Sequence, residues 1–135
     1  MTALFNAAMN GQAAICDMLV KAGDVAGTPR GRHVDKADEA GKTALMMAAG
    51  CGHVDAVKAL HSAGASMEIA DNAGKTALLW AAYTGELMAT EILLANGANT
   101  DHEDKYGDTA LSHARARGHT EVAELLCLRA APSTV

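Results

Sequence analysis

The strongest constraint on the fold is a fixed spacing of 33 residues between equivalent positions. Three threonines have this spacing, and so do sets of aspartates, glycines and leucines: Thr43, Thr76 and Thr109; Asp38, Asp71 and Asp104; Gly41, Gly74 and Gly107; Leu60, Leu93 and Leu126. An internal repeat of this length is typical of proteins that stack one supersecondary unit many times. The sequence therefore predicts a row of similar units.

A weaker copy of the unit comes before these three. It shares a threonine, two glycines and a leucine with the next unit, at a spacing of 41 residues: Thr2, Gly11, Leu19 and Gly23. The additional residues are assigned to an insertion at 26–33, which contains glycine and proline and is expected to form an exposed loop. We expect a single domain over 1–131, with repeats at about 1–37, 38–70, 71–103 and 104–131, and a tail at 132–135.

Each unit has the pattern of two short antiparallel helices preceded by a turn. In the third unit, Asp71 to Gly74 supply turn residues, and Thr76 is a good N-cap for a helix over 77–83. Gly85 separates this helix from a second one over 86–96. One helix pair cannot bury its own apolar face, so several pairs must stack. The predicted fold is an all-α solenoid of stacked helix-turn-helix pairs with short β-hairpin-like connecting loops.

The repeated stretches also carry a family pattern. Residues 38–53, 71–85 and 104–119 share a turn glycine, a threonine and an alanine-containing helix in register, and 2–23 agrees more weakly. In these stretches the chain resembles the ankyrin repeat family, whose unit of about 33 residues carries a T-P-L-H-x-A signature. Alanine replaces the proline of that signature throughout, and its histidine is absent. The resemblance implies a non-catalytic scaffold that binds a partner protein through the concave groove of the stack.

The resemblance also implies which residues bind the partner. In this family, partners usually lie against the loop tips and the exposed side of the first helices. Carried over by position, the set is Glu39, Lys42, Met47, Cys51, Asn72, Lys75, Trp80, Tyr83, Thr84, Lys105, Tyr106, Asp108, His113 and Arg117. Tryptophan and tyrosine are enriched in interface hot spots, which favours a binding role for the three aromatic residues. The alternative for Trp80 is packing between first helices.

Composition narrows the classes of partner and the compartment. The net charge is −5, with 11 basic and 16 acidic residues and no basic stripe, so nucleic acid is not expected as a partner. Apolar runs are too short for a membrane span, and the first residues do not form a signal peptide. The three cysteines, Cys16, Cys51 and Cys127, form no C-x-x-C pair. They predict a reducing, intracellular location, either cytoplasmic or nuclear.

Motifs that could indicate chemistry lack the necessary context. Gly-Lys-Thr occurs at 41–43 and 74–76, but the additional glycine of a phosphate-binding loop is missing in both copies. Ser112 and His113 are neighbours on one predicted helix, so their side chains diverge and cannot form a nucleophile and base. Zinc-type ligand spacing is absent, and His53 and His119 are predicted to cap second helices. The sequence therefore predicts no catalytic residue, cofactor or metal.

Several alternatives remain open at this level. A regulatory or substrate-docking region of a larger enzyme, or an inhibitor acting on one, would use the same surface as any other scaffold. The chain is expected to be a monomer or part of a longer chain, with a partner of unknown identity. The residues 133–135, Ser-Thr-Val, also resemble a C-terminal ligand of PDZ domains.

Overall fold

The computed structural model describes residues 7–8, 10–12 and 37–130, with side chains to 128. The six helices within 37–130 are α3 (Ala44–Gly50), α4 (Val54–Ser62), α5 (Ala77–Thr84), α6 (Leu87–Ala95), α7 (Ala110–Ala116) and α8 (Thr120–Ala130). These described residues contain no strand, and the all-α helical fold is confirmed. The insertion at 26–33, Cys16 and the tail at 132–135 lie outside the described part of the chain.

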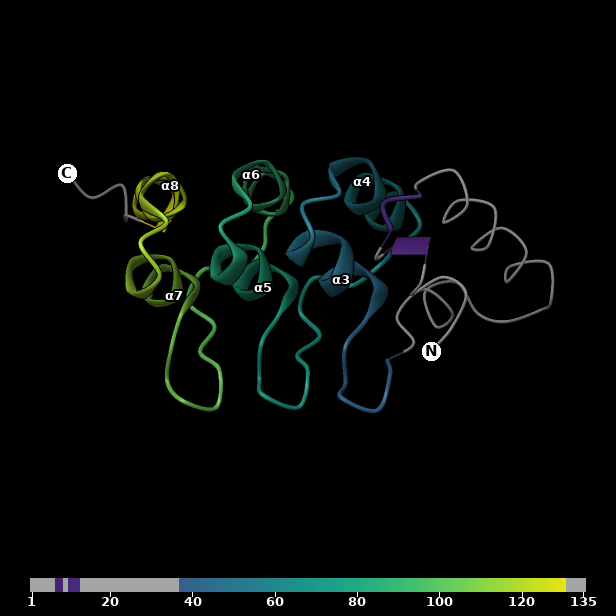
Figure 1. The fold of residues 1–135 in the computed structure, drawn as a ribbon, viewed down its shortest axis with the longest axis horizontal. Helices are drawn as coiled ribbons and strands as arrows, with labels where there is room; N and C mark the ends of the chain where they lie inside the picture. Colours follow the sequence, from purple (N-terminus) through teal and green to yellow (C-terminus); the bar gives the residue numbers. More distant parts are fainter. Residues whose placement is uncertain (1–6, 9, 13–36, 131–135) are drawn as a thin grey trace, which may run out of the picture.

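The helices form two layers. Figure 1 shows α3, α5 and α7 side by side in one row, with α4, α6 and α8 in a second row on the side away from the long loops. Three loops project from the first row in the same direction: 38–42, 71–75 and 104–108. We call these loops the fingers. The observed arrangement is the stacked helix-turn-helix row that the 33-residue spacing predicts.

The predicted turn and cap residues delimit the first helices. Thr43, Thr76 and Thr109 are the N-caps of α3, α5 and α7, and each hydroxyl accepts a hydrogen bond from the backbone N–H three residues further along. Gly85 ends α5 with a left-handed φ of 80°, which a residue with a Cβ rarely adopts. His53 occupies the N-cap position of α4, as predicted, but its side chain makes no cap hydrogen bond to that helix.

Small residues between the first helices and leucines beneath them form the core. Ala48, Ala81 and Ala114 occupy one repeated position in α3, α5 and α7 and are fully buried, which allows the helices to approach closely. Leu60, Leu93 and Leu126 occupy one repeated position in the second helices and are also buried. Each buried leucine contributes about 1.5–3 kcal/mol through the removal of apolar surface from water.

Backbone hydrogen bonds join the fingers in register. The N–H of Asn72 donates to the carbonyl of Ala40 at 2.9 Å, and the N–H of Lys105 donates to Ala73 at 3.0 Å, one repeat further on. Within each finger, an aspartate holds the turn: Oδ1 of Asp71 accepts the N–H groups of Ala73 and Lys75, both at 2.9 Å. Side chains that project from adjacent fingers therefore have fixed relative positions.

Candidate functional site on the finger–helix face

Six of the predicted binding residues converge on one surface, formed by the fingers and the first helices. We call this surface the finger–helix face. Two lysines come from two fingers, two aromatic residues come from α5, and the others come from α7 and its C-cap. The six residues are Lys42, Lys75, Trp80, Tyr83, His113 and Arg117, and we call them the cation–aromatic cluster.

Cations cover both rings of α5. The Nζ atoms of Lys42 and Lys75 lie 4.9 Å and 5.2 Å from the centre of the Trp80 ring. Lys75 also lies 4.7 Å from the centre of the Tyr83 ring, and Cζ of Arg117 lies 4.1 Å from it. A cation above an aromatic face within about 6 Å is attracted by the ring quadrupole, with about 0.5–1 kcal/mol at exposed sites. The cluster therefore joins residues from three units into one surface.

The rings also contact one another. Tyr83 lies edge-on to Trp80, with centroids 6.0 Å apart and ring planes at 71°. The imidazole of His113 makes a similar contact with Tyr83, at 5.5 Å and 75°. Edge-to-face pairs of this kind contribute about 0.5–1.5 kcal/mol beyond the area that they bury. The three rings form a continuous row that runs from α5 to α7.

Two buried aspartates fix the ends of this row. Nε1 of Trp80 donates to Oδ2 of Asp71 at 2.9 Å, and Nε2 of His113 lies 2.8 Å from Oδ2 of Asp104. Since an ionised carboxylate can only accept, the His113 nitrogen in this bond carries the hydrogen. The two interactions join equivalent positions in consecutive repeats, so the second pair lies 33 residues after the first. Trp80 and His113 therefore have defined orientations before any partner binds.

The environment of Asp104 changes the affinity of its carboxylate for a proton. Burial by itself would raise the pKa of Asp104, because it disfavours the charged form. The hydrogen bond with His113 and the backbone N–H groups of Asp108 and Tyr106 outweigh this effect. The pKa of Asp104 is therefore lowered from its ordinary value, and the carboxylate stays ionised at neutral pH.

The position of Tyr83 holds small residues in the neighbouring units. The position of Tyr83 is occupied by Gly50 in the second unit and by Ala116 in the fourth. A Cβ built on Gly50 would lie 3.7 Å from Trp80, which is an ordinary van der Waals contact. Trp80 is half-buried and packs against the core, so its predicted packing role and its position on the face are both observed.

Other predicted residues lie outside the cluster. Glu39 and Asn72 are exposed on adjacent fingers, where the Asn72 amide donates to the Glu39 carbonyl at 3.0 Å. Thr84 is exposed at the end of α5, and its hydroxyl donates to the Trp80 carbonyl at 2.9 Å. Met47 is half-buried in α3, and the exposed Cys51 is a free thiol at the C-cap of that helix.

The finger at 104–108 presents a separate set of side chains. Lys105 and Tyr106 are exposed there, and Tyr106 is 79% exposed without an aromatic or cationic partner among the described residues. Asp108 is half-buried, and one of its ligand atoms lies within 4.8 Å of those of Asp104 and His113. Asp104 already accepts two backbone N–H groups and the imidazole, so hydrogen bonding accounts for this group of side chains.

Sequence reasoning did not identify the supporting residues of the face. The sequence pattern predicts only turn positions for Asp71 and Asp104, without a bond to a helix side chain. The signal in the sequence is a repeated spacing of nine residues. Trp80 follows Asp71 at this spacing and His113 follows Asp104, and both side chains carry a ring N–H. That coincidence predicts a contact within each unit.

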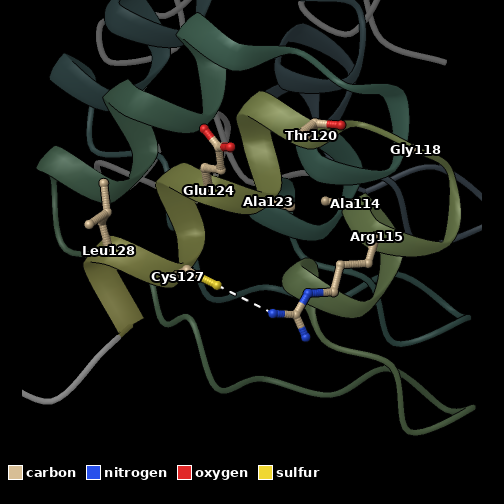
Figure 2. A pocket seen from close by; sticks show the side chains of 8 residues that line it. All are labelled: Ala114, Arg115, Gly118, Thr120, Ala123, Glu124, Cys127 and Leu128. Carbon is tan, nitrogen blue, oxygen red and sulfur yellow. Dashed lines mark hydrogen bonds between the residues drawn. The ribbon is translucent and has the colours of Figure 1, made fainter.

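A pocket of about 620 Å³ lies at a different place, the C-terminal end of the row. Figure 2 shows its lining on α7 and α8: Ala114, Arg115, Gly118, Thr120, Ala123, Glu124, Cys127 and Leu128. This is the side of the fourth unit against which a further unit would stack. The guanidinium of Arg115 lies across part of it and donates to the Cys127 sulfur at 3.5 Å.

The fold defines the class of the protein as a helical repeat solenoid with one loop-bearing edge. A family model described as ankyrin repeats (3 copies) matches residues 1–71 and 60–134, and the chain belongs to the ankyrin repeat family. Proteins of this family are generally non-catalytic modules for protein–protein interaction. No curated protein sequence matches the chain significantly. Within the described residues, every helix is too short or too polar to cross a membrane.

Proposed function

We propose that this chain is a non-catalytic scaffold that binds a partner protein through its finger–helix face. The observation that supports this proposal is the cation–aromatic cluster, which gathers side chains from three units on the face expected to meet a partner from the family resemblance. Tryptophan, tyrosine and arginine are the residue types most enriched in binding hot spots.

The cluster is also arranged so that binding would order few side chains. Trp80 is held by Asp71, and Tyr83 is held between Trp80 and His113. Immobilising a flexible side chain on binding costs about 0.5–1.5 kcal/mol, and part of this cost is already met in the free protein. A rigid aromatic row bordered by exposed polar groups is the usual anatomy of an interface core and its rim.

The same proposal extends to compartment and partner class. We propose a reducing intracellular location, supported by free thiols at the exposed Cys51 and the half-buried Cys127. The partner is a protein, and a partner that is itself an enzyme would dock on the same face.

Replacing Tyr83 by alanine tests this function. Tyr83 lies at the centre of the ring row but is not part of the buried core, so the Tyr83→Ala variant should remain folded. We expect it to lose about 1–4 kcal/mol of partner affinity, the range of hot-spot truncations. The measurement compares proteins retained from cell extract by the wild-type chain and by the variant, followed by titration of each retained protein.

The matched control is Lys58→Ala, because Lys58 is exposed on α4 in the other helix layer. Partners retained by the wild type and by the control, but lost from Tyr83→Ala, would support the proposed face. A set of partners unaffected by Tyr83→Ala would contradict it.

A further inference from the structure

We infer that the cation–aromatic cluster binds an acidic segment of the partner, in which every third residue carries a carboxylate and apolar side chains lie between the acids. This inference rests on the proposed function and specifies the chemistry of its partner. It is carried by the convergence of three cations on two aromatic rings, although the chain as a whole has a net charge of −5.

The cations of the cluster have no acidic partner in the described part of the chain. Lys42, Lys75 and Arg117 form cation–π contacts, and none of them has a carboxylate oxygen within 4.0 Å among the described residues. A surface lysine in an acidic chain would ordinarily be free to approach a carboxylate. Here the ring contacts hold the positive charges together instead.

The nearby aspartates do not neutralise these cations directly. Asp71 and Asp104 are only 7% and 6% exposed, and their oxygens accept hydrogen bonds from backbone groups and from the rings. Glu39 and Asp108 belong to the fingers, and neither forms an ion pair with Lys42, Lys75 or Arg117. The three cations can therefore still bind an anion that approaches the rings from the solvent side.

Repulsion between two of the cations also favours the binding of an anion. Lys42 and Lys75 lie over the same indole ring, so the two ammonium groups repel one another in the free protein. A carboxylate placed near both would relieve that repulsion and accept hydrogen bonds, since each ammonium has three N–H donors and its ring contact leaves some of them free. Opposite charge on the partner would also increase the association rate.

The repeat geometry indicates the spacing of the acids. Packed helices lie about 10 Å apart, and an extended peptide advances about 3.3 Å per residue, so one acid in every third position would match one cation per unit. The residues between the acids would lie against Trp80 and Tyr83, whose rings favour apolar contacts. A peptide of repeated Glu-Leu-Ser triplets has this pattern.

Trp80 is the only tryptophan in the chain, so its fluorescence reports binding at the cluster. The experiment titrates the full chain with the Glu-Leu-Ser peptide and with matched Gln-Leu-Ser and Lys-Leu-Ser peptides. We expect a saturable change in Trp80 emission with the glutamate peptide, at least about tenfold tighter than with the glutamine peptide. Added salt should weaken this binding, because the charges are partly exposed.

The test variant is Lys42→Gln combined with Lys75→Gln, and the matched control is Lys58→Gln on α4. Glutamine keeps the length of the stem, and circular dichroism would confirm that each variant has the wild-type helix content. We expect the double variant to lose the preference for the glutamate peptide, and the control to retain it. Equal binding of the glutamate and glutamine peptides, or no binding of either, would overturn the inference.

The two proposals fail separately. If capture of partner proteins still depends on Tyr83 while the lysine variants do not change peptide binding, the inference of an acidic segment is contradicted and the proposed binding face is still supported. If an oligothymidine binds more tightly than the glutamate peptide, the cluster selects phosphate and the inference is overturned. If no captured protein depends on Tyr83, the proposed function itself is contradicted.

Discussion

Asp104 shows how one buried side chain supports both the fold and the face. Its Oδ1 accepts the N–H groups of Tyr106 and Asp108 and so holds the finger at 104–108 in its turn. Its Oδ2 bonds to His113 and so orients the last ring of the cluster. A buried carboxylate is costly unless it is hydrogen-bonded, and here three donors meet that requirement.

The lowered pKa of Asp104 predicts a pH-dependent contribution to stability. An unfolded aspartate has a pKa of about 3.9. The contribution of ionised Asp104 to the free energy of unfolding is therefore fully present above that pH and is lost as the pH falls through the lower native pKa. We expect Asp104→Asn to reduce the free energy of unfolding at pH 7 by about 1–3 kcal/mol, typical of a hydrogen bond to a charged group. Urea denaturation at pH 7 and at stepwise lower pH measures this.

The difference between the wild type and Asp104→Asn should shrink as the pH falls below about 4, because the unfolded carboxylate then binds protons before the native one does. Asp101→Asn is the control, since Asp101 is exposed in the preceding connection. A difference that stays constant to the lowest pH would show that the charge of Asp104 contributes nothing.

At the level of the elements, glycine and histidine connect one helix pair to the next. The imidazole of His119, which precedes α8, lies 3.1 Å from the carbonyl of Tyr83 through Nε2. A Cβ built on Gly85 would lie only 2.5 Å from Nδ1 of the same ring. Gly85 is thus required both by its backbone angle and by close approach of the following unit.

Alanine substitution at two equivalent glycines separates these requirements. Gly118 has a φ of 76° like that of Gly85, but a Cβ there would meet nothing within 4 Å. We expect Gly118→Ala to cost about 1 kcal/mol for the left-handed backbone alone. Gly85→Ala should cost at least about 1 kcal/mol more, because it also displaces His119 from its hydrogen bond.

Thermal and urea unfolding of both variants would measure the difference in the free energy of unfolding. Adding His119→Ala to Gly85→Ala should remove most of the additional cost, since the two changes act on one contact. Equal costs for Gly85→Ala and Gly118→Ala would show that the close approach is not important.

The elements themselves were predictable from sequence, whereas their contacts were only partly so. The predicted helix over 77–83 differs from Ala77–Thr84 by one residue at its C-terminal end, and the helix over 86–96 differs from Leu87–Ala95 by one residue at each end, because caps and glycines act locally. The bonds from Trp80 to Asp71 and from His119 to Tyr83 depend on how the chain folds back on itself. The family resemblance predicted which surface would bind a partner, but it did not predict that lysine and arginine side chains contact the aromatic rings of that surface.

At the scale of the whole molecule, Arg115 distinguishes the final unit from the inner ones. The equivalent residues of the second and third units are Ala49 and Ala82, both fully buried under the following unit. Arg115 is exposed and covers part of the pocket at the end of the row. Within the described residues no unit covers this side of the fourth unit, and Arg115 places a charged group there, as an uncovered side of a repeat array requires.

We expect Arg115→Ala to increase self-association without unfolding the chain, because it restores the small residue that permits stacking. Light scattering over a range of protein concentrations would detect a larger species for Arg115→Ala than for the wild type. Glu121→Ala, a change at an exposed residue of α8 outside the pocket lining, is the control. Identical masses for the wild type and Arg115→Ala at every concentration would contradict this role.

The bond between a finger aspartate and a ring nitrogen also has a consequence for how such a protein diversifies. An indole occupies this position in one unit and an imidazole in the next, while the aspartate and the turn that it holds stay the same. In the second unit the position holds Met47, and Asp38 still organises its finger through Ala40 and Lys42. A lineage can therefore exchange this one side chain of a single unit while the architecture is inherited unchanged, and under the proposed function such an exchange would change the preferred partner.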